Sequence, residues 1–477
     1  MVKEKVSFAR NKEANFSRWY SDILEQAEIV DIRYNVKGFI VIRPLGAEII
    51  EKLYRMWENE LESKNHKPCI FPAIIPEKNF KKEANHVKGF SPDVFWLAET
   101  GEGKLALRPT SETAFYQLYS LWVRSWRDLP LKLYQRANVF RLETKATRPL
   151  IRAREFYWIE SHDAFATKEE AEAQVQEDIS ITEKLMHQKL GIPFLPLKRP
   201  YWDKFPGAEY TIGSDVLMPD GRVIQQPSTH LLGQLFSKSF EIKFKDEKGN
   251  ENFVWQTCYG PAMSRILSSL IAIHGDNSGL ILPFCISPIQ AVIIPIYTTE
   301  NKEKILEKAS KIQQDLEERG INAEVDDSDK KPGDKFYFWE MRGVPLRIEL
   351  GERELKGKLT LFLRDTKERI NVDIKDIEKE GERLDERLRQ KAEKNSQHSI
   401  AECKNKAEIK KALEDKKIAR CNFCSVDKEG EKCAEIIEKE LGAFVRGTRH
   451  DKKEKASGKC VICNKPATEV VYVAKSY

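Results

Sequence analysis

The stretch VFRLETKATRPLIRAREFYWIESHDAF, residues 139–165, decides the fold of this chain. Apolar and aromatic residues alternate at its two ends with a polar segment between them, which predicts a strand, a loop and a second strand. Arg141 and Glu143 are two residues apart and are expected on one face of the first strand. The same spacing puts Arg152 and Arg154 on one face after the loop. The forked guanidinium of arginine suits phosphates, so this hairpin could bind a nucleotide. A surface hairpin held by ion pairs would show the same sequence pattern.

The length and net charge of the chain limit the number of domains and the kind of partner it can bind. At 477 residues and 55.2 kDa the chain is too long for one core, and we expect two to four domains. Its 80 Lys+Arg and 75 Asp+Glu residues leave a net charge of only +5, so RNA binding would depend on local patches. The first twenty residues lack an apolar leader, and the longest apolar run, residues 279–296, carries three prolines. We therefore expect a cytoplasmic protein with no membrane segment.

The pattern along the chain predicts two kinds of sheet. In the first part, strand-like runs stand beside helical patterns over residues 47–64 and 168–189, which predicts a large antiparallel sheet with helices around it. From Pro288, strands alternate with helices in a compact α/β domain, and a charged helix over residues 374–397 leads to a cysteine-rich module. The strand-like runs of the first part are GFIVIRP (38–44), CIFPAII (69–75) and KLALRPT (104–110).

Four further segments help to decide between these two interpretations of the hairpin. RPTSE follows a strand, KFPGAEYT and QQPSTH form polar turns, and CYGPAMSRILSSLIAIHGDN runs through Arg265 into an apolar helix. With these beside it, the segment from Phe140 resembles motif 2 of the class II aminoacyl-tRNA synthetases. The run through Arg265 is similar to motif 3, and CIFP after the long helix resembles motif 1, the dimer-forming element. The motifs stand in the family's order.

Within that class, the sequence resembles the prolyl-tRNA synthetases of archaeal and eukaryotic type. The resemblance implies a class II catalytic domain over residues 1–287, an α/β anticodon-binding domain over 288–382 and a small α/β zinc-binding domain over 383–477. It also implies a homodimer formed through motif 1. The segments that carry it are FSRWY, EANHVKGF, RPTSET, RSWRDLP, TRPLIR, KFPGAEYT, HGDNSGLILP, SPIQAVIIPI, RGVPLRIELG and VAKSY.

The resemblance also assigns site residues. Arg141 and Arg265 would be the catalytic arginines, which neutralise charge while L-proline is joined to ATP. Mg²⁺ would accompany the nucleotide, and the prolyl group would pass to the terminal ribose of tRNA(Pro). The residues expected to hold proline are Thr110, Glu112, Arg141, Phe205 and His230. Those expected to bind ATP are Arg141, Glu143, Arg152, Phe156, Gln225, Ser228 and Arg265.

Two positions depart from the archaeal-type pattern. Ser228 stands where a threonine is expected, and residues 260–265 are one residue longer than the pattern. The extra residue leaves open which of Ala262, Met263 and Ser264 meets ATP.

In the α/β domain, the resemblance places Glu340 and Arg347 where they would read anticodon bases. An arginine fork suits the O6/N7 edge of guanine, and proline anticodons carry two guanines. A surface ion pair is the alternative for each residue.

The C-terminal cysteines have metal-ligand spacing. Two CxxC pairs, at Cys421 and at Cys460, would by spacing alone hold a structural Zn²⁺. The family's layout instead implies the set Cys424, Cys433, Cys460 and Cys463, which leaves Cys421 spare.

Three other interpretations compete with this one. Threonyl enzymes of the same subclass hold an active-site zinc with one cysteine and two histidines, whereas the analogous loops here offer Thr110, Glu112 and His230. Non-catalytic relatives usually lose the ATP arginines, which this chain keeps. A zinc-binding module would explain the tail but not the first part. The segment between residues 165 and 259 is long enough for the family core only, so we expect no editing domain.

Overall fold

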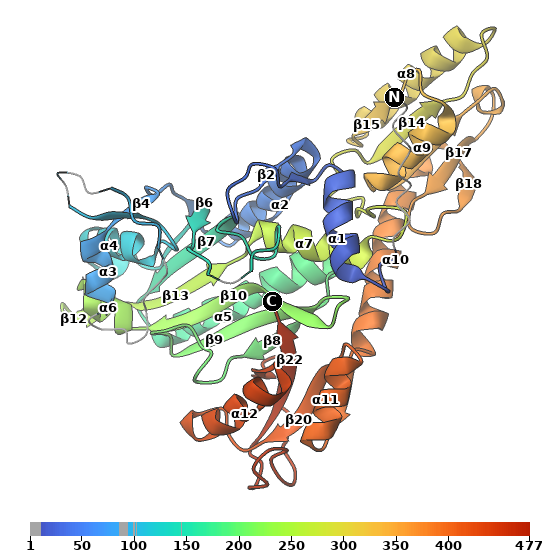
Figure 1. The fold of residues 1–477 in the computed structure, drawn as a ribbon. Helices are drawn as coiled ribbons and strands as arrows, with labels where there is room; N and C mark the ends of the chain where they lie inside the picture. The colour runs from blue at the N-terminus through green and yellow to red at the C-terminus, as the bar shows by residue number, and fades with distance from the viewer. Residues whose placement is uncertain (1–10, 85–93, 99–100, 102, 145) are drawn as a thin grey trace.

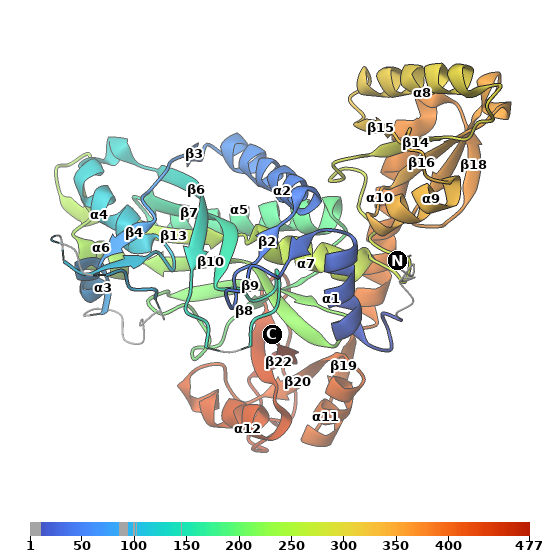
Figure 2. The same ribbon diagram turned by 45° about the horizontal axis from the view of Figure 1, so that its top comes forward.

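The computed structural model describes residues 11–84, 94–98, 101, 103–144 and 146–477. Figure 1 shows a large body built on one sheet, a smaller α/β domain at one end and a C-terminal part below the body. Helix α10 (Ile377–Gln397) runs from the α/β domain to the C-terminal part, as Figure 2 also shows. Most of the segment EANHVKGF lies outside the described residues.

The body is organised around an eleven-stranded sheet. Its central strands run antiparallel in the order β8-β9-β10-β13-β7-β6, which confirms the predicted antiparallel sheet, and β3 adds in parallel beside β6. Strand β7 is buried along its second half because other elements cover both faces of the sheet there. These strands are β3 (Lys67–Pro68), β6 (Leu131–Phe140), β7 (Glu155–Phe165), β8 (Leu195–Lys198), β9 (Tyr210–Leu217), β10 (Arg222–Gly233) and β13 (Trp255–Gly260).

Helices on one face of this sheet build the main core. Helices α2, α5 and α7 pack on one another or on the central strands, and Trp57 of α2 donates to the Tyr259 hydroxyl across that core. The helices of the body are α1 (Phe16–Gln26), α2 (Pro44–Ser63), α3 (Glu77–Ala84), α4 (Glu112–Trp122), α5 (Lys168–Thr182) with a π-helical continuation (Glu183–Lys189), α6 (Leu235–Phe240) and α7 (Met263–His274). Its short strand pairs are β1 (Val30–Asp31) with β2 (Val41–Ile42), β4 (Ile74–Pro76) with β5 (Leu105–Leu107), and β11 (Lys243–Lys245) with β12 (Glu251–Phe253).

Three local predictions were wrong in extent. Of KLALRPT only Leu105–Leu107 form a strand. Of CIFPAII only Ile74 and Ile75 lie in a strand, because the amide of Phe71 donates to the Gln135 side chain and not to a neighbouring strand. Of GFIVIRP only β2 is a strand, and α2 begins at Pro44, where a proline fits the first helical turn.

The predicted hairpin is also shorter than its sequence suggests. Strand β6 ends at Phe140 and β7 begins at Glu155, so Arg141 and Glu143 do not share a strand face. The amide of Glu143 bonds back to the Arg141 carbonyl in a tight turn. The two strands therefore deliver the loop between them to the edge of the sheet, where its side chains can reach a ligand.

The α/β domain has the predicted strand and helix alternation. Its sheet order is β15-β14-β16-β17-β18, with the first three strands parallel. Alternate residues of β14 face two helices, since Ile293 packs in the core with α8 and Val292 packs with Trp339 of α9. The elements are β14 (Ala291–Pro295), α8 (Lys302–Glu317), β15 (Ala323–Val325), α9 (Pro332–Met341), β16 (Leu346–Leu350), β17 (Leu359–Leu363) and β18 (Arg369–Val372).

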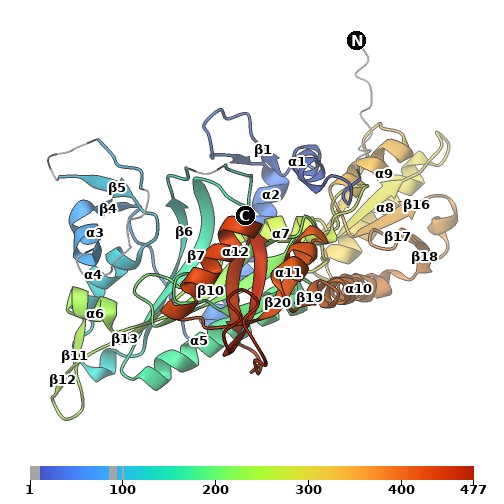
Figure 3. The same ribbon diagram turned by 60° about the horizontal axis from the view of Figure 1, so that its bottom comes forward.

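The C-terminal part extends the central sheet. Strand β21 pairs with β8, and β22 runs parallel to the start of β10, so the sheet passes without a break from the body into this part. Figure 3 brings it forward, with α11 and α12 on either side of its strands. Its elements are β19 (Ile400–Cys403), α11 (Lys406–Glu414), β20 (Ile418–Phe423), α12 (Glu431–Leu441), β21 (Phe444–Arg449) and β22 (Glu469–Ser476).

Within the described ranges, no helix combines the length and the apolar character needed to cross a membrane.

Candidate active site

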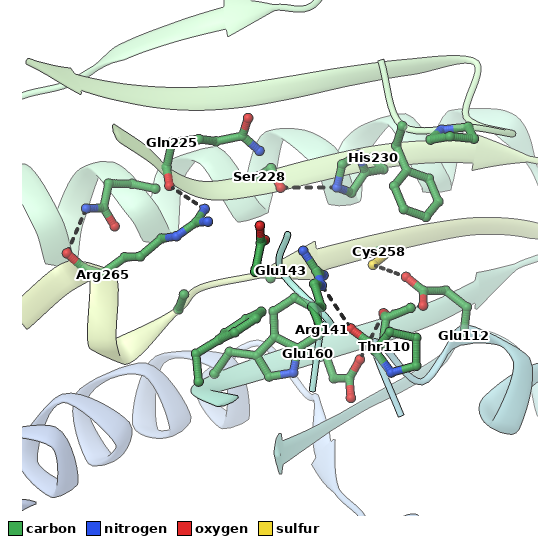
Figure 4. A pocket seen from close by; sticks show the side chains of 18 of the residues that line it. Thr110, Glu112, Arg141, Glu143, Glu160, Gln225, Ser228, His230, Cys258 and Arg265 are labelled. Atoms are coloured by element: carbon green, nitrogen blue, oxygen red, sulfur yellow. Dashed lines mark hydrogen bonds between the residues drawn. The ribbon is translucent and has the colours of Figure 1, made fainter. Parts of the chain in front are cut away.

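A cavity of about 430 Å³ opens on the face of the central sheet, at the end of the β6–β7 hairpin (Figure 4). Strands β7, β10 and β13 form its floor, and the loop after β6 and the turn before α7 form its rim. Nearly all of the expected proline and ATP residues line it: Thr110, Glu112, Arg141, Glu143, Phe156, Phe205, Gln225, Ser228, His230 and Arg265.

One end of the cavity is small and carries a carboxylate. Glu112 begins helix α4, is 2% exposed, and accepts hydrogen bonds from the Thr110 hydroxyl and, at 3.6 Å, from the Cys258 thiol. The rings of Phe205 and His230 lie 4.8 Å apart and close the apolar side. This end therefore combines buried carboxylate acceptors with an aromatic wall, which suits a small cationic amine with an apolar body.

His230 is held as a neutral acceptor or donor within this wall. Its Nδ1 lies 2.8 Å from the Thr211 hydroxyl and its Nε2 lies 3.1 Å from the Ser228 hydroxyl. Burial, and then the nearby Arg199 and His162, lower the pKa of His230 to about 3. The imidazole is therefore uncharged at neutral pH, and it adds no repulsion toward a cationic amine.

Three lining residues beyond the expected set matter for this end. Glu160 accepts from the Ser111 amide at 3.0 Å and from Gln135 Nε2 at 2.8 Å. Burial would raise the pKa of Glu160, but His162, followed by the Ser111 hydroxyl and Gln135, lowers it. Trp158 and Glu160 follow Phe156 at two-residue steps on β7, so they share its face. That period was readable in the sequence, and it could have added both residues. Cys258 also lines the cavity, but its position carries no comparable signal.

Arginines line the middle and the other end of the cavity, with Arg141 Nε donating to the Pro109 carbonyl at 3.2 Å, beside Thr110. The Arg141 guanidinium lies 5.1 Å from the Phe156 ring centroid and 5.5 Å from that of Trp158. Arg265, at the start of α7, donates to the carbonyls of Ile151 and Gln225, both at 3.2 Å. Burial, and then repulsion from Arg141 and Arg152, lower the pKa of Arg265 to about 10. Converging buried cations of this kind favour an anionic ligand.

Arg152 does not line the cavity. Its Nη1 lies 3.8 Å from the Glu143 carboxylate, and its Nη2 donates to the main-chain oxygen of Tyr477. Arg152 therefore belongs to the rim, where it joins the loop after β6 to the end of β22. Of the three residues left open in the turn before α7, only Ala262 lines the cavity, while Met263 and Ser264 are buried in α7.

Two clusters have metal-binding donor types among the described residues. The sulfurs of Cys424, Cys433, Cys460 and Cys463 lie within 4.8 Å of one another, and Cys421, on β20, is not part of this group. Four thiols at that spacing fit a tetrahedral Zn²⁺. Glu112, His162 and Cys258 also lie within 4.8 Å. Their atoms already bond to Thr110, Tyr116, Glu160 and each other, so we regard this second cluster as a hydrogen-bonded wall.

The two expected anticodon residues lie together but are not exposed. Arg347 Nη1 donates to Glu340 at 2.9 Å, and its guanidinium lies 4.0 Å from the Phe336 ring centroid and 3.9 Å from that of Phe362. Arg347 is thus clamped between two rings, with only 3% of its side chain exposed.

The comparisons with known proteins match this architecture part by part. Residues 95–274 match the class II core domain of the tRNA synthetases for G, H, P, S and T, residues 290–384 match an anticodon-binding domain, and residues 406–477 match the prolyl-tRNA synthetase C-terminal domain. The proline–tRNA ligase of Thermofilum pendens is 49% identical over 98% of both chains. That of Methanopyrus kandleri is 42% identical over 99% of this chain and 98% of its own.

Solved structures of prolyl-tRNA synthetases superpose on nearly the whole of this chain. The Giardia lamblia prolyl-tRNA synthetase in complex with prolyl-adenylate superposes with a TM-score of 0.94 at 37% identity, covering 99% of this chain and all of the other. The Cryptosporidium parvum enzyme complexed with halofuginone and AMPPNP gives a TM-score of 0.91 at 32% identity, covering 99% of each chain.

The antiparallel sheet, with an arginine-lined cavity at the end of its hairpin, defines a class II aminoacyl-tRNA synthetase. The substrate follows from the relatives and from the C-terminal domain. The chain belongs to the prolyl-tRNA synthetase family, the proline–tRNA ligases, and it activates proline and charges tRNA with it.

Proposed function

We propose that the cavity forms prolyl-adenylate from L-proline and ATP and then passes the prolyl group to a hydroxyl of the 3′-terminal ribose of tRNA(Pro), with AMP as the leaving group. The observation that carries this proposal is the polarity of one continuous cavity, with the Glu112 carboxylate at one end, Arg265 toward the other and Arg141 between them. Such a cavity can hold a cationic amine and a polyphosphate in line with each other.

In the first step, the proline carboxylate oxygen attacks the α-phosphorus of ATP. A P–O bond to the amino acid forms, and the bond to pyrophosphate breaks, with the negative charge leaving on pyrophosphate. No general base is required, because the attacking carboxylate is already ionised. Catalysis then rests on alignment and on stabilising the charge of the transition state.

Each end of the cavity has a proposed role in that step. Glu112 and Thr110 hold the proline amine, and Phe205 and His230 enclose the pyrrolidine ring. Arg141 and Arg265 hold the proline carboxylate and the phosphates, while Glu143, Phe156, Gln225 and Ser228 bind the rest of ATP. The charge of the bound nucleotide would be neutralised in part by its Mg²⁺. Arg152 adds its charge from the rim when the phosphates bind.

A screen of ATP–pyrophosphate exchange with all twenty amino acids tests the pocket. We expect proline to lead. Glu112→Gln should raise KM for proline by about 100-fold, since a buried charge-assisted pair is lost, and should leave KM for ATP within about twofold. Equal changes in both constants would contradict the assignment of Glu112 to the amine.

The remaining assignments are proposals of the same kind. Glu340 and Arg347 form the anticodon-reading pair: the Glu340 carboxylate, which is 25% exposed, meets the bases, and the buried Arg347 donates to it and fixes its position between the Phe336 and Phe362 rings. Glu340→Gln should then raise KM for tRNA(Pro) by about tenfold without changing exchange, whereas the exposed Glu303→Gln should change neither. The four-cysteine cluster holds a structural Zn²⁺.

We further propose a homodimer formed through motif 1. Ile70, in the CIFP segment, is 96% exposed in the single chain, which is unusual for a large apolar side chain flanked by core residues. Sedimentation should show a dimer for the wild type, and Ile70→Arg should weaken it. A monomeric wild type would contradict this proposal.

We propose domain boundaries at residues 287/288 and 382/383, no editing domain within the chain, and a cytoplasmic location, where tRNA is charged. Residues 166–258, all of which the structure describes, supply α5, α6 and strands β8–β12. Cleavage sites from limited proteolysis would test the boundaries.

A further inference from the structure

A buried carboxylate joins the C-terminal part to the catalytic sheet. Asp215 of β9 is 1% exposed and accepts from two arginines that are far apart in the sequence. Arg199, directly after β8, donates to it from Nη1 at 3.0 Å and from Nη2. Arg446, on β21, donates from Nε at 2.7 Å and from Nη2 at 3.2 Å. Burial alone would raise the pKa of Asp215, but the two guanidiniums lower it to about 2, so it stays ionised.

The Arg199 guanidinium has one available orientation. Its Nη1 also donates to the Arg446 carbonyl at 2.8 Å. Its plane lies on Gly213, where an added Cβ would come within 2.3 Å of Nη2 and 2.7 Å of Cζ. A side chain at residue 213 would therefore displace Arg199, and only glycine leaves it room. Strand β21 thus fixes Arg199 in two ways: the Arg446 side chain holds Asp215, to which Arg199 donates, and the Arg446 carbonyl accepts from Arg199 directly.

Arg199 in turn holds a residue of the ATP end of the cavity. Its Nη2 donates to Gln225 Oε1 at 3.0 Å, and the Gln225 carbonyl accepts from Arg265 Nη1 at 3.2 Å. Gln225 lies where the pairing of β10 with β9 shifts register, between Gln225 and Ser228. At such a bulge the ladder fixes the backbone less firmly, so side-chain bonds carry more of the positioning.

We infer that Arg446, Asp215 and Arg199 are positioning residues through which the C-terminal part holds Gln225, and with it Arg265, in place for ATP. This inference rests on the proposed role of Gln225 in binding ATP. Residue 446 must be an arginine, because the forked guanidinium of arginine can donate to both oxygens of Asp215 at once, whereas the single ammonium of lysine cannot. Ion pairs of this depth add little net stability compared with apolar packing, so a geometric role explains their presence better than a stabilising one.

The experiment measures KM for ATP and for proline in pyrophosphate exchange, together with Tm, on the full chain. Arg446→Gln should raise KM for ATP by about tenfold and leave KM for proline within about twofold. Arg446→Lys, which keeps the charge but not the fork, should resemble Arg446→Gln in KM for ATP while losing less Tm. Arg449→Gln removes another arginine of β21, one that pairs with Asp451, and should change neither KM.

A double variant separates the inference from the proposed function. Gln225→Ala should raise KM for ATP, and adding Arg446→Gln to it should raise KM no further, because both changes act through one side chain. Two results would refute the positioning network while leaving the ATP role of Gln225 intact. One is a fall in Tm of Arg446→Gln with no change in its KM for ATP. The other is a double variant in which the two effects on KM for ATP multiply. If Gln225→Ala leaves KM for ATP unchanged, the ATP role of Gln225 fails and the network fails with it.

Discussion

Arg152 donates a hydrogen bond from Nη2 to the main-chain oxygen of Tyr477, which lies 325 residues further along the chain. The Tyr477 hydroxyl donates to Asp220 at 2.7 Å, and the Arg148 guanidinium lies 5.5 Å from the Tyr477 ring centroid. The last residue therefore anchors the loop between β6 and β7, which carries the rim of the cavity.

Deleting Tyr477 should release this loop. Arg152 and Arg148 then lose a fixed partner, and kcat/KM for ATP in pyrophosphate exchange should fall about tenfold, the usual cost of one hydrogen bond to a charged group. Tyr477→Phe keeps the main-chain oxygen and the ring, and it should lose threefold or less by the same reasoning, roughly half of that energy. Unchanged exchange after the deletion would show that the loop is positioned without Tyr477.

The cysteine cluster predicts which thiols hold zinc. Elemental analysis should find about one zinc ion per chain in the wild type and in Cys421→Ser, but none in Cys460→Ser, because a structural site needs all four ligands. Loss of the metal should also lower Tm, since binding free energy at such sites is folding free energy. Zinc lost from Cys421→Ser and kept by Cys460→Ser would contradict the set of four.

The proposed proline pocket predicts that the enzyme also activates alanine. Alanine lacks methylene groups of proline, and missing methylenes in an apolar pocket are worth only about 1–3 kcal/mol. Alanine should therefore support measurable pyrophosphate exchange, with kcat/KM lower than that of proline by about 10- to 200-fold per group lost. We propose that the chain has no editing domain, and alanyl-tRNA(Pro) should then accumulate in the purified reaction, so that a separate deacylase would have to remove it in the cell. Rapid hydrolysis of alanyl-tRNA(Pro) by the chain itself would contradict this account.

Asp178 predicts a pH dependence of stability. It is fully buried beneath the sheet, accepts from Thr229 and Gln174, and burial followed by the nearby Asp163 raises its pKa to about 7 from 3.8. The folded state therefore holds a proton that the unfolded state releases. Its contribution to stability is complete below pH 3.8 and is lost progressively as the pH rises through about 7.

Calorimetry of Asp178→Asn checks this sign. The Tm of the wild type minus that of Asp178→Asn should be larger at pH 5 than at pH 8, because the asparagine cannot ionise. The lost second acceptor costs about 1 kcal/mol at every pH and does not change the trend. The exposed Asp329→Asn should track the wild type at both pH values. Parallel Tm curves for the wild type and Asp178→Asn would show that Asp178 is ionised in the fold.

Much of the fold and most of the cavity were predictable from sequence, for identifiable reasons. Apolar periodicity marked α5, α8 and the strands of the α/β domain. The motif residues fell into one cavity because most of them lie on the central strands β7 and β10 or in the segments directly after β6 and β13. Trp158 and Glu160 were missed although they share the period of Phe156. The pairing of β21 with β8 was not predictable, because two strands so far apart in the chain leave no local pattern that names their partner. The Arg199–Asp215–Arg446 network depends on that pairing and was missed with it.

The most direct test of the central claim is proline-dependent ATP–pyrophosphate exchange in the wild type, Arg265→Ala and Arg127→Ala. Arg265 is buried among cations at the ATP end of the cavity, whereas Arg127 lies on the surface against Trp126. We predict rapid exchange in the wild type and in Arg127→Ala, and a loss of about 10²–10³-fold in Arg265→Ala, the effect of removing one group that stabilises transition-state charge. Exchange retained by Arg265→Ala would contradict the account of this cavity as the site of adenylate formation.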